Sequence, residues 1–397
     1  MAEQKVVIVG AGLGGLRTAE SLRSHGFSGK IQIVGDETYL PYNRPPLSKD
    51  ALKSGLTHED LQYRLRDSVS DIEWMLGEPA TQLDLDDMKV SLADGAELFF
   101  DGLVIATGIR PRLLPIPGPT KGLFTLRNLT EAQQLRQVIK PGANLVIIGS
   151  GFIGCELAAT ATQLGANVHV VSLDQEPMIT PLGFELGVSM RERHEINGVT
   201  FHLGRTVAEF NGSDHITSVT LDNEEVLTTN IVVEAVGSVP NTEWLEGNGL
   251  DITNGVLVDK SMHVLGTDLP VVAVGDIARH PHPLYLGESL RIEHWNMPTE
   301  TGKVAGATLT AILAGESTDQ IAFNGLPAFW SDQFEFQIQA YGVPGAASSS
   351  KLVMGDYNGP CIVEYLDPKG ELCGVVGIDT AKELLPYRKQ LLSRLAN

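Results

Sequence analysis

The stretch Lys5-Val-Val-Ile-Val-Gly-Ala-Gly-Leu-Gly-Gly15 decides the fold, because an apolar run passes directly into a glycine turn. A helix-like stretch continues to His25, and a second apolar run covers Ile31–Val34. This order of strand, glycine turn, helix and strand is typical of a parallel βαβ unit. The turn has the form G-x-G-x-x-G, whose glycines allow the tight bend, the approach of backbone to a pyrophosphate, and close packing of the helix. The first unit therefore predicts a dinucleotide site at the positive end of its helix.

The same pattern returns later in the chain. Asn144-Leu-Val-Ile-Ile-Gly-Ser-Gly-Phe-Ile-Gly154 repeats the strand and the glycine turn, and Val168–Val171 repeats the second strand. One glycine turn is a weak signal, but two copies, each between a strand and a helix, predict two dinucleotide sites. The glycines of the two turns are Gly10, Gly12 and Gly15, then Gly149, Gly151 and Gly154.

An acid that binds a ribose is expected at the end of the second strand of each unit. Asp36 and Glu37 stand there in the first unit, although an acidic surface turn is the alternative interpretation. In the second unit Ser172 takes that place, and Asp174 follows shortly after. No Arg or Lys occurs in residues 172–187, so this stretch offers no cradle for a 2′-phosphate. We therefore expect NADH rather than NADPH in the second site.

Two further segments echo each other, each being an apolar strand followed by a small turn, a glycine and a proline. They are Leu103–Pro111 and Ile231–Pro240, and we expect each to return beside its nucleotide. Another strand ends at Gly275-Asp276, where the acid either binds a ribityl hydroxyl or caps a following helix. The residues that these turns add to the two sites are Ala106, Thr107 and Gly108, then Val236 and Gly237.

The chain length and the net charge limit which classes of protein this sequence can belong to. The 397 residues favour two or three domains of about 100–200 residues each. The formal charge of −20 repels a phosphate backbone, so no nucleic-acid partner is expected, although the acidity alternatively serves solubility alone. No apolar run reaches the roughly 18 residues of a membrane helix, and no secretory segment precedes Val6–Val9. Three cysteines without a C-x-x-C pair fit a reducing cytosol, so we expect a cytoplasmic protein with no membrane association.

Other motifs are weak. His280 and His282 share the sequence His-Pro-His-Pro, but without a cysteine or acid partner they make a poor metal site, and no metal is expected. Neither G-x-S-x-G nor H-E-x-x-H occurs in the sequence, so hydrolase chemistry has no support.

Several segments carry a resemblance to a known family: Pro41-Tyr-Asn-Arg-Pro-Pro-Leu-Ser-Lys49, Gly149-Ser-Gly-Phe-Ile-Gly-Cys-Glu156, Val274-Gly-Asp-Ile-Ala-Arg279, Ile292-Glu-His-Trp295 and Phe329-Trp-Ser-Asp-Gln333. With the two glycine turns, the chain resembles the flavoprotein reductases of the glutathione-reductase-like superfamily. More narrowly, it resembles the ferredoxin reductases that serve bacterial aromatic-ring dioxygenases and some cytochromes P450. The resemblance implies FAD in the first site, NAD(P)H in the second, and a carboxy-terminal domain that covers the flavin.

The expected fold class is therefore α/β, with two Rossmann-like dinucleotide-binding domains and a C-terminal α+β domain. Alternating runs at Ile362–Tyr365 and Val375–Ile378 indicate antiparallel strands in the last domain, before a closing helix that ends at Leu395. We predict a discontinuous FAD domain over residues 1–112 and 242–320, an NAD(P)H domain over residues 113–241, and a cap over residues 321–397.

By position, the resemblance implies specific contacts with FAD. Asp36 would bind the adenosine ribose, Thr81 the adenine end through its backbone, and Arg127 would reach the cofactor from the link into the second domain. Asp276 would bind the ribityl chain or the pyrophosphate, and Trp295 would lie against the isoalloxazine ring. The alternatives are ordinary helix entry for Arg127 and core packing for Trp295. The full set is Gly10, Gly12, Leu13, Gly14, Gly15, Asp36, Glu37, Arg44, Lys49, Thr81, Ala106, Thr107, Gly108, Arg127, Gly275, Asp276, Glu293, His294 and Trp295.

The second site holds the groups nearest the chemistry, because the nicotinamide and flavin rings must stack without water between them. Phe152 either covers the flavin until the nicotinamide displaces it or simply packs. Lys49 and Glu156 are expected to form an ion pair, in which the cation favours the negative charge of reduced flavin. Asn43 departs from the family, which has an acid at that position. The catalytic set is Lys49, Glu156, Phe152 and Trp295, and the pyridine-nucleotide set is Gly149, Gly151, Phe152, Ile153, Gly154, Glu156, Ser172, Asp174, Val236 and Gly237.

The cysteines indicate the electron acceptor. Disulfide reductases of this superfamily carry a cysteine pair in the first FAD helix region, and relatives that reduce peroxide or oxygen carry one, but this chain has no cysteine before Cys155. We expect Cys155 to be a buried structural thiol. Electrons would then leave singly toward a [2Fe–2S] ferredoxin, or less readily a rubredoxin, that feeds an aromatic-ring dioxygenase in preference to a cytochrome P450.

An acidic ferredoxin would dock on cations beside the flavin edge, for which the candidates are Arg64, Arg66, Arg291 and Lys303. The protein is expected to be a monomer or homodimer. Two alternatives stay open. One is an NADH oxidase or thiol/disulfide reductase of the same superfamily, and the other is a non-catalytic flavin-binding redox sensor.

Overall fold

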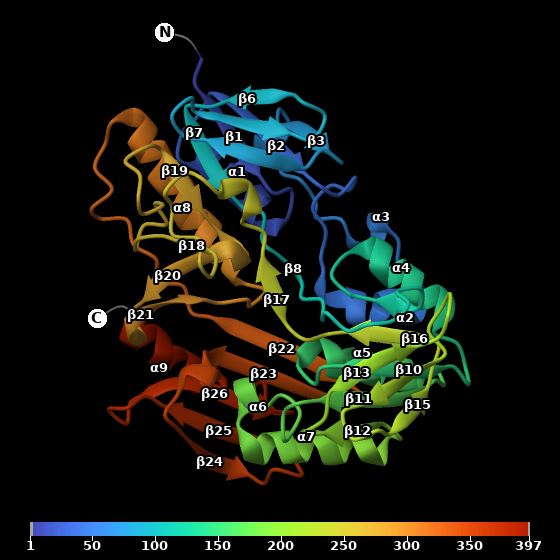
Figure 1. The fold of residues 1–397 in the computed structure, drawn as a ribbon. Helices are drawn as coiled ribbons and strands as arrows, with labels where there is room; N and C mark the ends of the chain where they lie inside the picture. The colour runs from blue at the N-terminus through green and yellow to red at the C-terminus, as the bar shows by residue number, and fades with distance from the viewer. Residues whose placement is uncertain (1–2, 396–397) are drawn as a thin grey trace.

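The computed structural model describes residues 3–395, apart from the side chains of residues 286–288, and arranges its main sheets in three lobes (Figure 1). The first lobe is built on a five-stranded parallel sheet in the order β19-β7-β1-β2-β3. Its central strands are buried on both faces, which is why their sequences are continuous apolar runs. Because β19 lies beside β7, Gly275 and Asp276 return to the first lobe. The strands are β1 (Lys5–Val9), β2 (Lys30–Gly35), β3 (Glu73–Leu76), β7 (Gly102–Ile105) and β19 (Val271–Ala273).

The second lobe repeats this arrangement in a parallel sheet of order β12-β11-β10-β16-β9. A glycine turn and a buried helix follow the central strand of each sheet, namely α1 (Leu13–Ser24) after β1 and α5 (Phe152–Gln163) after β10. The repeat predicted from the glycine turns is therefore confirmed. The strands are β9 (Leu123–Phe124), β10 (Asn144–Ile148), β11 (Asn167–Ser172), β12 (Thr200–Leu203) and β16 (Ile231–Glu234).

Each of these lobes also carries a small antiparallel sheet that the sequence analysis does not predict. Between the lobes, β8 (Ile109–Pro111) pairs with β17 (Ser238–Pro240), so the two segments that echo each other in sequence meet in space (Figure 1). The small sheets are β4 (Ala80–Asp84), β5 (Lys89–Leu92) and β6 (Glu97–Phe99), then β13 (Val207–Asn211), β14 (Ser218–Leu221) and β15 (Val226–Thr228).

The third lobe, the cap, is an antiparallel sheet in the order β22-β23-β26-β25-β24 with the helix α9 (Leu385–Leu395) packed on it. These elements confirm the antiparallel strands and the closing helix. β22 packs against α5, which brings the cap beside the second glycine turn. The strands are β22 (Ala328–Gln333), β23 (Phe336–Gly342), β24 (Ser349–Gly355), β25 (Cys361–Leu366) and β26 (Leu372–Ile378).

The remaining elements surround these sheets. α8 (Met297–Ala314) lies along α1, and the α1–α8 contact is close because glycines on α8 face α1. Within residues 3–395, no helix combines the length and apolar character that crossing a membrane requires. The other helices and strands are η1 (Pro45–Ser48), α2 (Asp50–Ser54), α3 (His58–Leu61), η2 (Asp67–Val69), α4 (Leu129–Val138), α6 (Ile179–Leu182), α7 (Phe184–Ile196), η3 (Glu243–Leu245), β18 (Val256–Leu257), η4 (Gly275–Ile277), β20 (Ala278–His282), β21 (Tyr285–Arg291) and η5 (Pro344–Ala346).

Candidate functional site

A cavity of about 810 Å³ is lined by residues of all three lobes. The predicted residues that line it are Gly10, Gly12, Leu13, Gly14, Asp36, Glu37, Arg44, Lys49, Thr81, Ala106, Thr107, Gly108, Arg127, Phe152, Ile153, Glu156, Gly275, Asp276, Glu293, His294 and Trp295. The predicted residues outside its lining are Gly15, Gly149, Gly151, Gly154, Ser172, Asp174, Val236 and Gly237. The cavity therefore joins the predicted flavin site to the first turn of α5, while the rest of the predicted pyridine-nucleotide set lies beyond it.

The glycine turn after β1 forms one wall of the cavity. Gly10 has φ +123°, and a Cβ there would lie 2.1 Å from Ala106 O, so only glycine fits. A Cβ at Gly12 would meet nothing within 4 Å, which leaves the backbone at the start of α1 open to the cavity. Open N–H groups at a helix N-terminus fit a pyrophosphate. The second turn repeats both features, since Gly149 has φ +106° and the space at Gly151 is open.

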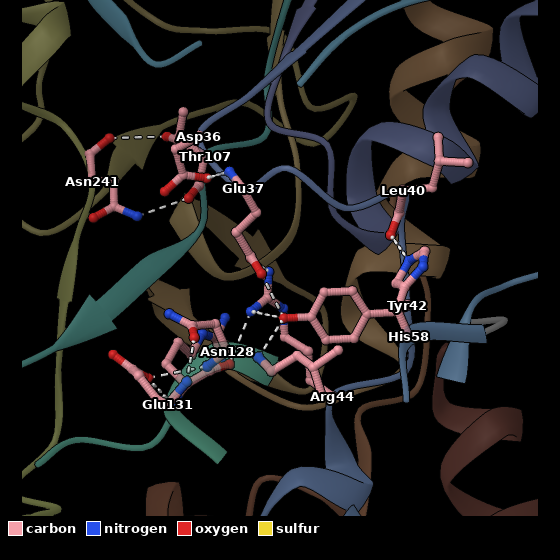
Figure 2. A network of polar contacts seen from close by, with 12 residues as sticks. Asp36, Glu37, Leu40, Tyr42, Arg44, His58, Thr107, Asn128, Glu131 and Asn241 are labelled. Carbon is pink, nitrogen blue, oxygen red and sulfur yellow. Dashed lines mark hydrogen bonds and ion pairs between the residues drawn. The ribbon is translucent and has the colours of Figure 1, made fainter. Parts of the chain in front are cut away.

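The two acids after β2 have separate surroundings, as Figure 2 shows. The Glu37 carboxylate accepts hydrogen bonds from Tyr42 Oη at 2.6 Å and from Arg44 Nη2 at 2.5 Å. Arg44 Nη1 also donates to Arg127 O at 2.9 Å. Asp36 accepts only a local bond from the Glu37 backbone N–H among the contacts of the described residues, so its carboxylate is the one left for a ribose hydroxyl. Glu37 instead holds Arg44 in place.

Arg127 combines the two alternatives stated for it. Its backbone N–H donates to Glu131 Oε2 at 2.6 Å, beside the capping box of α4, as expected of a residue at helix entry. Its guanidinium donates to Asp276 Oδ2 at 2.8 Å and lines the cavity. Asp276, at the start of η4, is therefore held by a cation rather than serving as a helix cap. This pair brings the link between the lobes into contact with η4, which follows the returning strand β19.

The predicted ion pair is confirmed, with Lys49 Nζ 2.8 Å from Glu156 Oε1. Both side chains are largely buried, with 13% and 6% of their surfaces exposed. Ser48 Oγ donates to Glu156 Oε2 at 2.5 Å, and Ser331 Oγ donates to Oε1 at 2.6 Å. A buried charge is tolerated when it is paired and its remaining lone pairs are hydrogen-bonded, and this carboxylate meets that condition.

Aromatic side chains surround this pair. The Phe329 ring lies 4.9 Å from Phe152 and 5.0 Å from His294, measured between centroids. Burial lowers the pKa of His294 to about 4, so the ring is neutral, and its Nδ1 has no partner among residues 3–395. A buried ring nitrogen without a partner in a cavity wall is suited to a polar group of a bound cofactor.

Trp295 is not a core residue, because 39% of it is exposed and it lines the cavity. Its indole Nε1 donates to Asn43 Oδ1 at 3.1 Å, and Tyr63 Oη donates to the same atom at 3.1 Å. Asn43 thus accepts two hydrogen bonds without adding a negative charge at the cavity mouth. Trp295 also meets Trp330 of the cap edge-on, with centroids 5.2 Å apart.

The expected ribose end of the second site contains a residue that the sequence analysis missed. Ser172 is buried, and its Oγ accepts bonds from Ser150 Oγ at 2.8 Å and from the Asp174 backbone N–H at 3.2 Å. Arg205, just past β12, donates its backbone N–H to Ser172 O at 2.9 Å. The search for a cation covered residues 172–187 only, whereas parallel pairing of β11 and β12 brings Arg205 to the same edge. The rule that neighbouring parallel strands end at the same edge of a sheet could have identified Arg205 from the sequence.

The cysteines lie away from the cavity lining. Cys155 is fully buried, its Sγ lies 3.3 Å from Ser150 O, and burial raises the pKa of its thiol. These surroundings confirm the expected buried thiol. His282 Nε2 lies 3.0 Å from Gly325 O, and residues 3–395 contain no cluster of three His, Cys, Asp or Glu side chains arranged to hold a metal.

The four candidate docking cations differ in exposure and in ion pairing. Arg291 is only 12% exposed and pairs with Glu293 at 2.5 Å, so it is not available to a partner. Lys303 is 61% exposed and pairs with Glu300 at 2.8 Å. Arg64 and Arg66 share a surface depression with Arg17, which the sequence analysis did not name.

Residues 4–302 match the family described as "Pyridine nucleotide-disulphide oxidoreductase". The chain belongs to the pyridine nucleotide-disulphide oxidoreductase family. Rhodocoxin reductase of Rhodococcus erythropolis is 34% identical over 98% of this chain and 90% of that protein. The ferredoxin--NAD(+) reductase component of the anthranilate 1,2-dioxygenase system of Burkholderia cepacia is 33% identical over 98% and 94%. The crystal structure of the covalent putidaredoxin reductase-putidaredoxin complex has a TM-score of 0.90 at 30% identity, covering 99% of this chain and 94% of that one.

As a pyridine nucleotide-disulphide oxidoreductase, the protein is an oxidoreductase whose cofactors are FAD and a pyridine nucleotide, and its two-Rossmann α/β fold is confirmed. The residues present fit FAD. The open turn at Gly12, the available carboxylate of Asp36 and the unpartnered Nδ1 of His294 face one cavity that reaches from the first helix to the Lys49–Glu156 pair.

Proposed function

We propose that this protein is a ferredoxin reductase, which takes a hydride from NADH onto FAD and passes single electrons to a [2Fe–2S] ferredoxin of an oxygenase system. The observation that carries the proposal is the make-up of the cavity wall. It contains the buried Lys49–Glu156 pair but no cysteine among its described lining residues. A disulfide reductase needs a thiol in contact with the flavin, whereas transfer to an external carrier needs only an accessible flavin edge.

The proposed site residues follow the cavity. Gly12 and the start of α1 would hold the FAD pyrophosphate, Asp36 the ribose, and Arg127 with Asp276 the middle of the cofactor. His294 and Trp295 would lie at the ring end. The second glycine turn and Ser172 would hold NADH, with Ile153 and Phe152 at the junction of the two ligands. The proposed domains are those of the sequence analysis, namely residues 1–112 with 242–320, residues 113–241 and residues 321–397.

Bound FAD supplies a two-electron acceptor that can release its electrons one at a time. Lys49 provides a fixed positive charge in a site that excludes much of the water, where such a charge stabilises developing negative charge more strongly than in solvent. Glu156 holds that ammonium in place through the 2.8 Å contact. Phe152, in contact with Phe329, covers the entry from the second lobe and limits water until the nicotinamide takes its place.

A basic depression beside the cavity supports an acidic protein partner. Its lining includes Arg17, Arg64 and Arg66 together with Asp67, in a chain whose net charge is −20, and Arg17 and Arg66 also pair with Glu20 at 2.7 and 3.5 Å. Tyr63 also lines it and reaches the cavity mouth through Asn43, which bonds Trp295. We propose that the ferredoxin docks here, because Tyr63 lines both the depression and the cavity, so an acidic carrier bound to these cations would lie near the flavin edge. Relatives include reductase components of dioxygenase systems and a ferredoxin reductase for the CYP199A2 system, and we propose a dioxygenase system first.

Anaerobic stopped-flow reduction of the FAD-loaded protein tests the proposal. NADH should bleach the flavin, and reoxidation by an added [2Fe–2S] ferredoxin should be much faster than by oxygen, by a disulfide or by rubredoxin. Rapid turnover with oxygen or a disulfide alone would indicate the oxidase or disulfide-reductase alternative. Very slow reduction with a stable protein complex would indicate the redox sensor. Sizing of the holoprotein and cell fractionation would test the proposed monomer or homodimer and the proposed cytoplasmic location.

A further inference from the structure

The segment Phe329–Gln333 of the cap directs a buried hydroxyl at the Lys49–Glu156 ion pair. Ser331 is fully buried, and its Oγ donates to Glu156 Oε1 at 2.6 Å. Lys49 Nζ lies 2.8 Å from the same oxygen, and Ser48 Oγ donates to Oε2 at 2.5 Å. One carboxylate of α5, in the second lobe, therefore binds side chains of residues 48 and 49 and of the cap.

The hydroxyl donors to this carboxylate are themselves held in place. Gln333 Nε2 donates to Ser331 Oγ at 2.9 Å, so the single proton of that hydroxyl is directed to Glu156. Thr160 Oγ1 donates to Ser48 O at 2.8 Å, which fixes the backbone that carries the second donor. Gln333 and Thr160 are both buried. Such a network, satisfied at the carboxylate, orients a charge more sharply than one contact does.

Resting on the proposed function, we propose that Ser331 is a positioning residue for hydride transfer. It keeps the Glu156 carboxylate turned toward Lys49, so the cap forms part of the reacting centre as well as covering it. The physical reason is that a hydrogen bond donated to a carboxylate is short and directional, so the donor fixes where the carboxylate oxygen lies. A purely structural bond would affect only the stability of the cap.

Few other ionisable groups face Glu156. The neighbouring Cys155 thiol stays protonated because burial raises its pKa, and His194 of α7 stays neutral because burial lowers its pKa to about 4. On β22, Asp332 is exposed, and strand alternation puts it on the face opposite Ser331. The strands β10 and β11 present apolar side chains to α5. Lys49 is thus the charged group in contact with Glu156 among the described residues.

The test is the single-turnover rate of anaerobic flavin reduction by saturating NADH, together with the flavin midpoint potential. In Ser331→Ala, loss of the donor should slow this rate by about tenfold, because the carboxylate no longer holds the Lys49 ammonium in one position. The potential should be more positive than in the parent, because the Lys49 charge is less closely balanced. Ser331→Thr, which keeps a hydroxyl, should restore both, and Ser48→Ala should change both in the same direction as Ser331→Ala.

Thr380→Val is the matched control, because Thr380 is a buried hydroxyl of the cap that donates to Cys361 O and does not contact Glu156. It should leave the rate and the potential unchanged. If NADH reduces the parent protein normally and Ser331→Ala behaves like this control, the positioning role is overturned and the proposed function stands. If NADH does not reduce the parent protein, the proposed function itself fails. In a Glu156→Gln background, Ser331→Ala should not change the rate or the potential any further. A further change in either would also overturn the inference.

Discussion

The substitution Glu156→Gln leaves a buried ammonium without its counter-charge. Lys49 Nζ and Glu156 Oε1 are 2.8 Å apart, and the two side chains are only 13% and 6% exposed. At an effective dielectric constant of about 20, opposite charges at this distance attract by about 6 kcal/mol, much of which is offset by their desolvation. Removing one partner of such a pair costs about 3–5 kcal/mol, because the other charge stays buried alone.

We expect this loss to appear in the rate of hydride transfer. Removing one fixed electrostatic group from a reacting centre slows it by about 10²–10³-fold, and we expect that factor for Glu156→Gln and for Lys49→Met. Because the two side chains act as a unit, the double variant should be slowed about as much as either single variant, rather than by the product of the two factors. The assay is single-turnover flavin reduction by saturating NADH without oxygen, at equal flavin content.

An exposed pair on α8 provides the control. Lys303 and Glu300 are also 2.8 Å apart, but they are 61% and 34% exposed, so Lys303→Met and Glu300→Gln should change the rate less than twofold. A double variant at Lys49 and Glu156 whose loss equals the product of the single losses would refute the reasoning. So would single variants that reduce their flavin at the parent rate.

Four further outcomes follow from the site and its surroundings. Arg64→Glu should raise the KM for ferredoxin several-fold while leaving NADH-dependent flavin reduction unchanged, and an unchanged KM would remove this cation from the docking surface. Arg205→Ala should lower kcat/KM for NADPH by about tenfold and leave kcat/KM for NADH within about twofold. Ser172→Glu should lower kcat/KM for NADPH relative to NADH further. Equal effects of Arg205→Ala on both nucleotides would place Arg205 away from the 2′ position. Cys155→Ser should retain NADH-to-ferredoxin turnover, and its loss would restore the thiol-relay alternative. Burial lowers the pKa of His194 to about 4 from 6.5, so the unfolded chain takes up this proton before the folded chain does as the pH falls. The free energy of unfolding should therefore drop by about 2 kcal/mol between pH 7 and pH 5. In His194→Phe, thermal unfolding should show a pH dependence of stability that is smaller by this amount, and an equal pH dependence in both proteins would contradict the assignment.

Local patterns in the chain were sufficient for the two main sheets. Each glycine turn couples a buried strand to a helix through contacts within a few residues, so both the motif and its position could be recognised without coordinates. The Lys49–Glu156 pair came from the resemblance and not from spacing, because its members are far apart in sequence. The small antiparallel sheets were missed, because short strands with modest apolar content give a weak periodic signal.

The sequence by itself determined the paired βαβ units, the cavity wall after β1 and the absence of a cysteine before Cys155, since these depend on neighbours along the chain. Only the tertiary structure decided which of Asp36 and Glu37 is available to a ligand, because the partners of Glu37 arrive from the following loop. It also decided that Arg205 lies beside Ser172 and that Ser331 reaches Glu156. Strand pairing and lobe packing bring distant residues together, so the hydroxyl donors to the Glu156 carboxylate come from residue 48 and from the cap, through contacts that no local pattern encodes.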